Sequence, residues 1–230
     1  MITVRVSLAN RLNGTPFKVE VRYALFDNEH TLYNPSQEFR NAILNKLYAY
    51  ISSSLGIGHD DLESEAQILR DRYGKRPMIV LFSMGHNLPF AEMSRASYLD
   101  VDPSDFGITS DNKLAESLNS IPIRKSIHTN SPSDFGFMII KALGLEGCFE
   151  KVIGPDNLDF EVKPAAAALA KALKIAGYVT DESIFIDNNP EVAHMADGLG
   201  MHGITVGRSN STTERNIDTI YDLVRMFRSE

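Results

Sequence analysis

The sequence predicts an α/β fold with a doubly wound, mainly parallel sheet, an inserted helical segment and an N-terminal β-hairpin. Three observations support this prediction. The apolar run Tyr23–Phe26, which ends at Asp27, is typical of a strand buried on both faces. Residues 37–110 show helical periodicity, and strand-like and helical segments alternate after residue 110. Such alternation with short connections favours a parallel sheet covered by helices on both sides.

The hairpin is predicted over residues 2–22. Apolar residues alternate with polar ones on both sides of Asn13-Gly14, a pair suited to the positive φ angles of a tight hairpin turn. We expect this hairpin at the edge of the core sheet. Two roles stay open for it, since it can cover a sheet edge or mediate a homodimer.

Residues 37–110 are expected to be helical, and only residues 78–82 also resemble a strand. Phe39, Ile43, Leu47 and Ile51 recur at helical spacing, and glycines follow where this helix should end. The predicted domains are therefore a core of residues 1–36 and 111–230 and an inserted helical unit of residues 37–110. The alternative of a free-standing helical bundle is disfavoured, because α/β alternation resumes after the insert.

The second part of the core is predicted element by element. Apolar runs predict strands at residues 121–129, 151–153, 183–187 and 204–206. Helical patterns predict helices at residues 133–143, 164–176, 190–199 and 212–228. Polar residues cluster where several of these strands end, which is where open α/β sheets bind ligands.

The composition is that of an ordinary globular protein. The chain has 230 residues, of which 43% are hydrophobic, and a net charge of −7. An acidic chain without a basic run disfavours a nucleic-acid polymer as partner, although it does not exclude a small phosphate ester. No apolar run approaches the length of a membrane span. The single cysteine, Cys148, excludes an internal disulfide and fits a cytoplasmic location.

The stretch around Asp27 resembles the first motif of the haloacid dehalogenase (HAD) superfamily, Asp-x-Asp-x-Thr followed by an apolar residue. Asp27 takes the position of the nucleophile and Thr31 that of the threonine. The following Leu32 and Tyr33 resemble the ending common in the pyrimidine 5′-nucleotidase-like branch. The superfamily's second aspartate is replaced by Glu29.

Three later stretches resemble the remaining HAD motifs in the correct order. Thr129 and Asn130 follow an apolar strand as in the second motif, and Lys163 precedes a helix as in the third. Asp187 ends a strand as in the fourth, with Asn188 after it. The resemblance covers about residues 22–208 and implies that the helical insert is a cap.

The resemblance implies a magnesium-dependent phosphatase for a small phosphorylated metabolite, with a nucleoside monophosphate as the favoured substrate. Asp27 would attack phosphorus and form an aspartyl-phosphate, with Glu29 as acid and base. Mg²⁺ would be held by Asp27, Asp187 and the backbone carbonyl of Glu29. Thr129, Asn130 and Lys163 would bind the phosphate, and Lys163 would also supply positive charge during transfer.

Two departures from the motifs support an alternative function. Glu29 is one methylene longer than the usual aspartate, and Asn188 removes one negative charge from the fourth motif. A catalytically impaired HAD-like protein that binds a phosphate ligand or a protein partner is therefore the alternative. Metal-free dehalogenation is disfavoured by the acidic residue at Asp187. The sequence does not specify the substrate.

Overall fold

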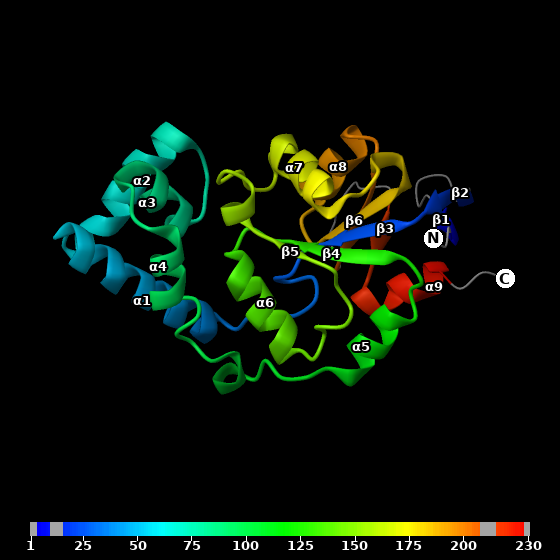
Figure 1. Cartoon of the computed structure of the whole chain (residues 1–230), viewed down its shortest axis with the longest axis horizontal. Coiled ribbons are helices and arrows are strands. Elements are labelled where there is room, and N and C mark those ends of the chain that lie inside the picture. Colours follow the sequence, from blue (N-terminus) through cyan, green and yellow to red (C-terminus); the bar gives the residue numbers. More distant parts are fainter. Residues whose placement is uncertain (1–3, 10–15, 208–214, 228–230) are drawn as a thin grey trace.

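The core of the molecule is one six-stranded sheet, seen in a computed structural model that describes residues 4–9, 16–207 and 215–227 (Figure 1). All neighbouring strands are parallel, in the order β5-β4-β3-β6-β7-β8. Their bounds are β3 (Tyr23–Phe26), β4 (Arg124–His128), β5 (Val152–Ile153), β6 (Ser183–Asp187), β7 (His202–Val206) and β8 (Asn216–Ile217). The predicted doubly wound parallel sheet is confirmed.

Helices cover both faces of this sheet. One face packs against α5 (Asn112–Asn119), α6 (Ser133–Ala142) and α9 (Leu223–Phe227), and the other against α7 (Ala166–Ala176) and α8 (Pro190–Gly198). Residues of β3 alternate between these two layers, with Phe26 on the first side and Leu25 on the second. Because all four residues of β3 are buried, the strand is uniformly apolar.

Four helices between β3 and β4 form a separate group beside the sheet, at the left of Figure 1. They are α1 (Gln37–Leu55), α2 (Leu62–Tyr73), α3 (Met78–His86) and α4 (Phe90–Ala96). The Ser36 side chain caps α1 by accepting a hydrogen bond from the Phe39 amide, and Gly56 ends it with a positive φ. The group has its own apolar cluster, centred on buried residues such as Leu47, Leu62 and Phe82.

The predicted hairpin exists, but it does not extend the core sheet. Strands β1 (Val4–Ala9) and β2 (Pro16–Val21) pair with each other in a separate two-stranded antiparallel sheet. The predicted turn at Asn13-Gly14 lies outside the described residues. The expectation of a strand at the edge of the core sheet is wrong, because β8 occupies one edge and β5 the other.

The end of the chain also differs from the prediction. Instead of one helix over residues 212–228, the described part contains β8, which pairs with β7, and the short helix α9. Tertiary pairing at the open edge of β7 overrides the local helical pattern at Asn216 and Ile217. No helix in the described ranges is long and apolar enough to span a membrane.

Candidate active site

The predicted site residues meet at the carboxyl end of the sheet, where the chain order of the strands reverses. From β3 the chain continues to β4 and β5 on one side, whereas β6 lies on the other side. The Asp27 amide, directly after β3, donates a hydrogen bond to the Ile186 carbonyl of β6 at 2.8 Å. This bond fixes Asp27 beside Asp187, the last residue of β6, in the crevice where such sheets bind ligands.

Lys163 joins the two carboxylates. Its Nζ lies 2.5 Å from Asp27 Oδ1 and 2.9 Å from Asp187 Oδ2. The exposed fractions of Asp27, Lys163 and Asp187 are only 5%, 7% and 2%. Three charged side chains therefore contact one another in a nearly dry environment, where their interactions are stronger than at the surface.

The backbone of Lys163 is held by Asn130. The Lys163 amide donates to Asn130 Oδ1 at 2.8 Å, and Asn130 Nδ2 donates to the Lys163 carbonyl at 3.0 Å. Lys163 itself precedes α7, which begins at Ala166, rather than lying in its first turn. The predicted phosphate-binding role of Asn130 stays a prediction, while its observed bonds position the lysine.

Burial and mutual attraction shift the ionisation of this group. Burial raises the pKa of Asp27, opposed by the Lys163 ammonium, and raises the pKa of Asp187 to about 6. Burial alone would lower the pKa of Lys163, but the Asp187 and Asp27 carboxylates raise it above its ordinary value. The two carboxylates share one cation, so the site has a surplus of negative charge that suits an additional cation.

Glu29 lies next to this group and is oriented by Thr129. Thr129 Oγ1 donates to Glu29 Oε2 at 2.9 Å and accepts a hydrogen bond from the Ser131 amide at 3.0 Å. The other carboxylate oxygen, Glu29 Oε1, is buried without a hydrogen-bond partner among the described residues. Thr129 thus uses its one hydroxyl proton on Glu29 here, and its predicted contact with phosphate stays a prediction.

Neighbouring polar groups complete the support of the carboxylates. Thr31 Oγ1 donates to Asp27 Oδ2 at 3.1 Å, and the Asn189 amide donates to Asp187 Oδ1 at 2.8 Å. Asn188 stands where the fourth HAD motif commonly has an acidic residue, and it lines a cavity together with Asp27 and Asp187. The structure therefore brings together every residue that the sequence analysis selected for the site.

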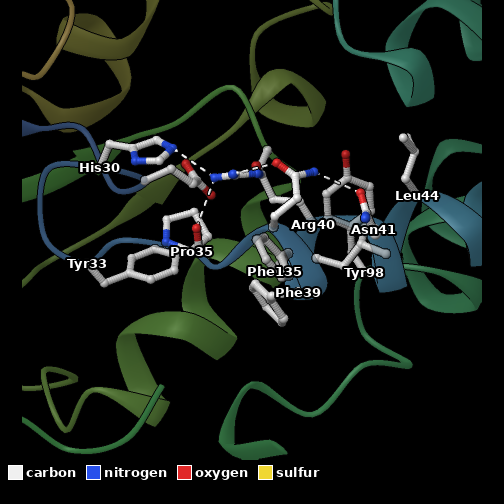
Figure 2. Close-up of a pocket in the computed structure, with 13 residues that line it drawn as sticks. His30, Tyr33, Pro35, Phe39, Arg40, Asn41, Leu44, Tyr98 and Phe135 are labelled. Carbon is white, nitrogen blue, oxygen red and sulfur yellow. Dashed lines mark hydrogen bonds between the residues drawn. The ribbon is translucent and has the colours of Figure 1, made fainter. Parts of the chain in front are cut away.

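Two cavities adjoin at this place. The carboxylate cavity, of about 270 Å³, is lined by residues that include Asp27, Asn130, Lys163 and Asp187. The apolar cavity, of about 370 Å³, lies between α1 and the end of the sheet (Figure 2). Glu29 and His30 line both, so the cavities meet at these two residues.

The oxygen donors present at the site fit a magnesium ion. Asp27 and Asp187 both bind Lys163 Nζ and line the same cavity, so two carboxylates lie close together there. No group of three or more His, Cys, Asp and Glu side chains that could hold a metal occurs in the described ranges. Mg²⁺ needs no such group, because it retains several waters and uses one or two carboxylates.

Some residues of the site had not been predicted from the sequence. The apolar cavity is lined by rings from three distant segments, among them Tyr33, Tyr98 and Phe135. No motif marks Tyr98 or Phe135, because their proximity depends on how α4 and α6 pack. Thr31 belongs to the first motif, but its hydrogen bond to Asp27 is visible only in the structure.

Solved structures with the same architecture include enzymes of two kinds. An L-2-haloacid dehalogenase from Xanthobacter autotrophicus matches with a TM-score of 0.56 at 16% identity, covering 89% of this chain and 97% of that chain. A HAD phosphatase from Thermococcus onnurineus matches with a TM-score of 0.57 at 21% identity, with the same coverages of 89% and 97%.

The molecule has the haloacid dehalogenase fold. The HAD-hydrolase YfnB from Bacillus subtilis, whose structure was solved bound to magnesium, matches as well, with a TM-score of 0.55 at 13% identity over 91% of this chain and 99% of that chain. No family model matches the sequence. The haloacid dehalogenase fold predicted from the four motifs is confirmed, and the pyrimidine 5′-nucleotidase-like branch stays a prediction.

Proposed function

We propose that this chain is a phosphatase that hydrolyses small phosphate monoesters through a covalent intermediate on Asp27. The observation that carries the proposal is the buried contact of Lys163 Nζ with both Asp27 and Asp187. A carboxylate can attack a phosphate dianion only where their repulsion is reduced. Lys163 provides fixed positive charge beside the attacking oxygen, in a site where that charge acts at low dielectric.

The reaction divides into two displacements. In the first, an Asp27 oxygen bonds to phosphorus, the ester P–O bond breaks, and the leaving alkoxide takes a proton from Glu29. In the second, water attacks phosphorus, loses its proton to Glu29, and the bond between phosphorus and Asp27 breaks. Phosphate leaves, and Asp27 and the protonated Glu29 are regenerated. The bond from Thr129 orients Glu29 for this transfer.

Mg²⁺ is the cofactor we propose. Asp27, Asp187 and the Glu29 carbonyl would hold it, and Asn188 would contribute no charge. When bound, the ion neutralises negative charge on the phosphoryl oxygens. We expect Asn188 to weaken the affinity for the ion relative to an acidic residue at this position, since the site then carries one less negative charge.

Similar proteins and the placement of the helices support this proposal. A phosphatase and a magnesium-bound hydrolase share the fold, although dehalogenases do as well. We favour phosphatase chemistry because Asp187 adds a second carboxylate beside the nucleophile. Residues 37–110 are proposed to act as a cap over the core of residues 1–36 and 111–230. A nucleoside monophosphate remains the substrate suggested by the resemblance.

Replacing the nucleophile tests the proposal. Asp27→Asn should lower Mg²⁺-dependent phosphate release from acetyl phosphate and a panel of monoesters by on the order of 10³-fold or more. Asp105→Asn, at an exposed position, should retain the wild-type rate. Thermal melting of both variants would show whether the loss reflects chemistry rather than unfolding.

Absence of turnover in the wild-type protein would contradict the phosphatase and favour the non-catalytic alternative. Binding of a phosphate compound without release of phosphate would then be expected. The double variant Glu29→Asp, Asn188→Asp would identify the cause, because a gain of activity would assign the loss to these two positions.

A further inference from the structure

The proposed phosphoryl chemistry takes place in the carboxylate cavity and does not use the apolar cavity. The two cavities nevertheless adjoin at Glu29 and His30. Four aromatic rings line the apolar cavity, together with aliphatic side chains from α1. The rings belong to Tyr33, Phe39, Tyr98 and Phe135, and the aliphatic residues are Ile43 and Leu44. The ring of Phe135 packs edge to face on that of Tyr98, with 5.1 Å between the ring centroids. It stacks on the ring of Phe39, with 6.1 Å between the centroids. An aromatic ring of a bound ligand can make favourable stacked or edge-to-face contacts with these side chains.

The position of Glu29 decides which part of a substrate would occupy this cavity. Glu29 lines both cavities and, in the proposed function, donates a proton to the oxygen of the leaving alcohol. That oxygen must therefore lie at the junction of the cavities, with phosphorus toward Asp27. The carbon atoms next to the oxygen then lie in the apolar cavity.

The buried part of this cavity is lined by apolar and aromatic side chains, Tyr33, Phe39, Ile43 and Phe135. Its polar lining residues are exposed or half-buried, namely Glu29, His30, Gln37, Arg40, Asn41 and Ser131. The Tyr98 hydroxyl has no hydrogen-bond partner among the described residues, and burial followed by the nearby Glu29 charge raises the pKa of Tyr98. In the buried part, a sugar or polyol would place several hydroxyls against aromatic and aliphatic walls, where the Tyr33 and Tyr98 hydroxyls can serve only one or two of them; each hydroxyl left without a partner costs binding energy. An apolar body with at most one or two polar atoms suits the cavity better.

Arg40 adds a flat cation at the rim. Its guanidinium donates to the Pro35 carbonyl and to Gln37 Oε1, both at 2.9 Å, and lies 3.3 Å from His30 Nε2 (Figure 2). No ion pair joins Arg40 to a carboxylate among the described residues, although local hydrogen bonds and then the charge of Arg40 lower the pKa of the neighbouring Glu38. A guanidinium fixed in this way can stack on the face of an aromatic ring.

We propose that the substrate is the phosphate monoester of an aromatic alcohol, whose ring is joined to the ester oxygen directly or through one carbon and occupies the apolar cavity. The inference rests on the proposed phosphatase function, and it specifies a substrate class for the same site. It disfavours nucleotides and sugar phosphates, in which a polar ribose or sugar would lie in the apolar cavity.

The test compares benzyl phosphate with ribose 5-phosphate and uridine 5′-monophosphate. All three are esters of primary alcohols, so recognition rather than leaving-group chemistry should dominate the comparison. We expect kcat/KM for benzyl phosphate to exceed the other two values by about tenfold or more. Acetyl phosphate, whose leaving group is too small to fill the cavity, reports phosphoryl chemistry separately.

Variants locate the selectivity in the cavity. Tyr98→Leu should lower the ratio of kcat/KM for benzyl phosphate to that for acetyl phosphate by about tenfold, whereas Tyr98→Phe should preserve most of it because it keeps the ring. Leu44→Asp, at an exposed position on the rim, should also lower the ratio. Tyr50→Leu, whose hydroxyl bonds to Glu92 instead, should leave it unchanged. The ratio does not depend on the fraction of folded protein.

The outcomes separate the two proposals. Hydrolysis of acetyl phosphate with equal or lower kcat/KM for benzyl phosphate than for ribose 5-phosphate would overturn the aromatic substrate and leave the phosphatase intact. A preference for benzyl phosphate that Tyr98→Leu and Tyr50→Leu reduce equally would overturn the cavity assignment. No hydrolysis of any compound would overturn the phosphatase, and the substrate inference with it.

Discussion

At the scale of single residues, the least expected feature is a buried histidine beneath the candidate site. His128, the last residue of β4, has no exposed surface, and neither ring nitrogen has a hydrogen-bond partner among the described residues. Its ring lies 6.0 Å from that of Phe185. Burial and then the positive charge of Lys163 hold the pKa of His128 well below its ordinary value. The imidazole is therefore neutral in the folded protein.

We expect His128 to reduce stability in acid. Below about pH 6.5 the imidazole takes up a proton in the unfolded chain but not in the folded one. Protonation therefore stabilises the unfolded state relative to the folded state as the pH falls. The wild type should lose stability between pH 7.5 and pH 5.5, and in His128→Leu this loss should be smaller by about 1.4 kcal/mol. Urea denaturation at the two pH values measures this difference.

An exposed histidine provides the control for that measurement. His194→Leu, on the exposed side of α8, should keep the wild-type loss of stability. His128→Leu should also stabilise the protein by about 1 kcal/mol at pH 7.5, because it removes buried nitrogens without partners. An unaltered pH dependence in His128→Leu would show that the imidazole is protonated or hydrogen-bonded in the native state.

At the scale of elements, the loop before α7 connects the inserted helices to the site. Arg76, between α2 and α3, donates to the Phe160 carbonyl at 2.8 Å and forms an ion pair with Glu161 at 3.4 Å. The Phe160 ring lies 5.4 Å from that of Phe90 in α4, and Val162 packs into the apolar cluster of the four helices. Lys163 follows directly, so the position of its ammonium depends on both parts of the molecule.

This connection predicts a catalytic effect of a residue remote from the chemistry. Arg76→Ala should lower kcat/KM for acetyl phosphate by about tenfold or more, because small displacements of a catalytic group are costly. Arg95→Ala, on the exposed side of α4, is the matched control and should have no effect. Equal rates for Arg76→Ala and the wild type would show that Asn130 alone positions Lys163.

At the scale of the whole molecule, the sequence predicted the parallel sheet and the meeting of the site residues for clear physical reasons. Strands buried on both faces are uniformly apolar, and residues at the ends of parallel strands must converge, as Asp27 and Asp187 do. Features set by long-range packing were missed or wrong. They include β8 in place of a helix, the separate hairpin sheet and the walls of the apolar cavity.

The distribution of contacts along the chain predicts an order of folding. The helices α1–α4 pack on one another through neighbouring segments, whereas Tyr23 of β3 pairs with Arg124 and Ser183. Contacts close in sequence form faster than distant ones. Pulsed hydrogen exchange during refolding should therefore show protection of amides in α1–α4 before those in β3. Simultaneous protection would indicate a single nucleus that includes the sheet.

The insertion of α1–α4 between β3 and β4 also has a consequence during synthesis on the ribosome. The central strand of the sheet is made early, yet its partners β4 and β6 are made only after the inserted helices and α5. Until then both edges of an apolar strand are open to other chains. The nascent protein thus carries this apolar strand unpaired for much of translation, and its yield should depend on chaperones that cover the strand.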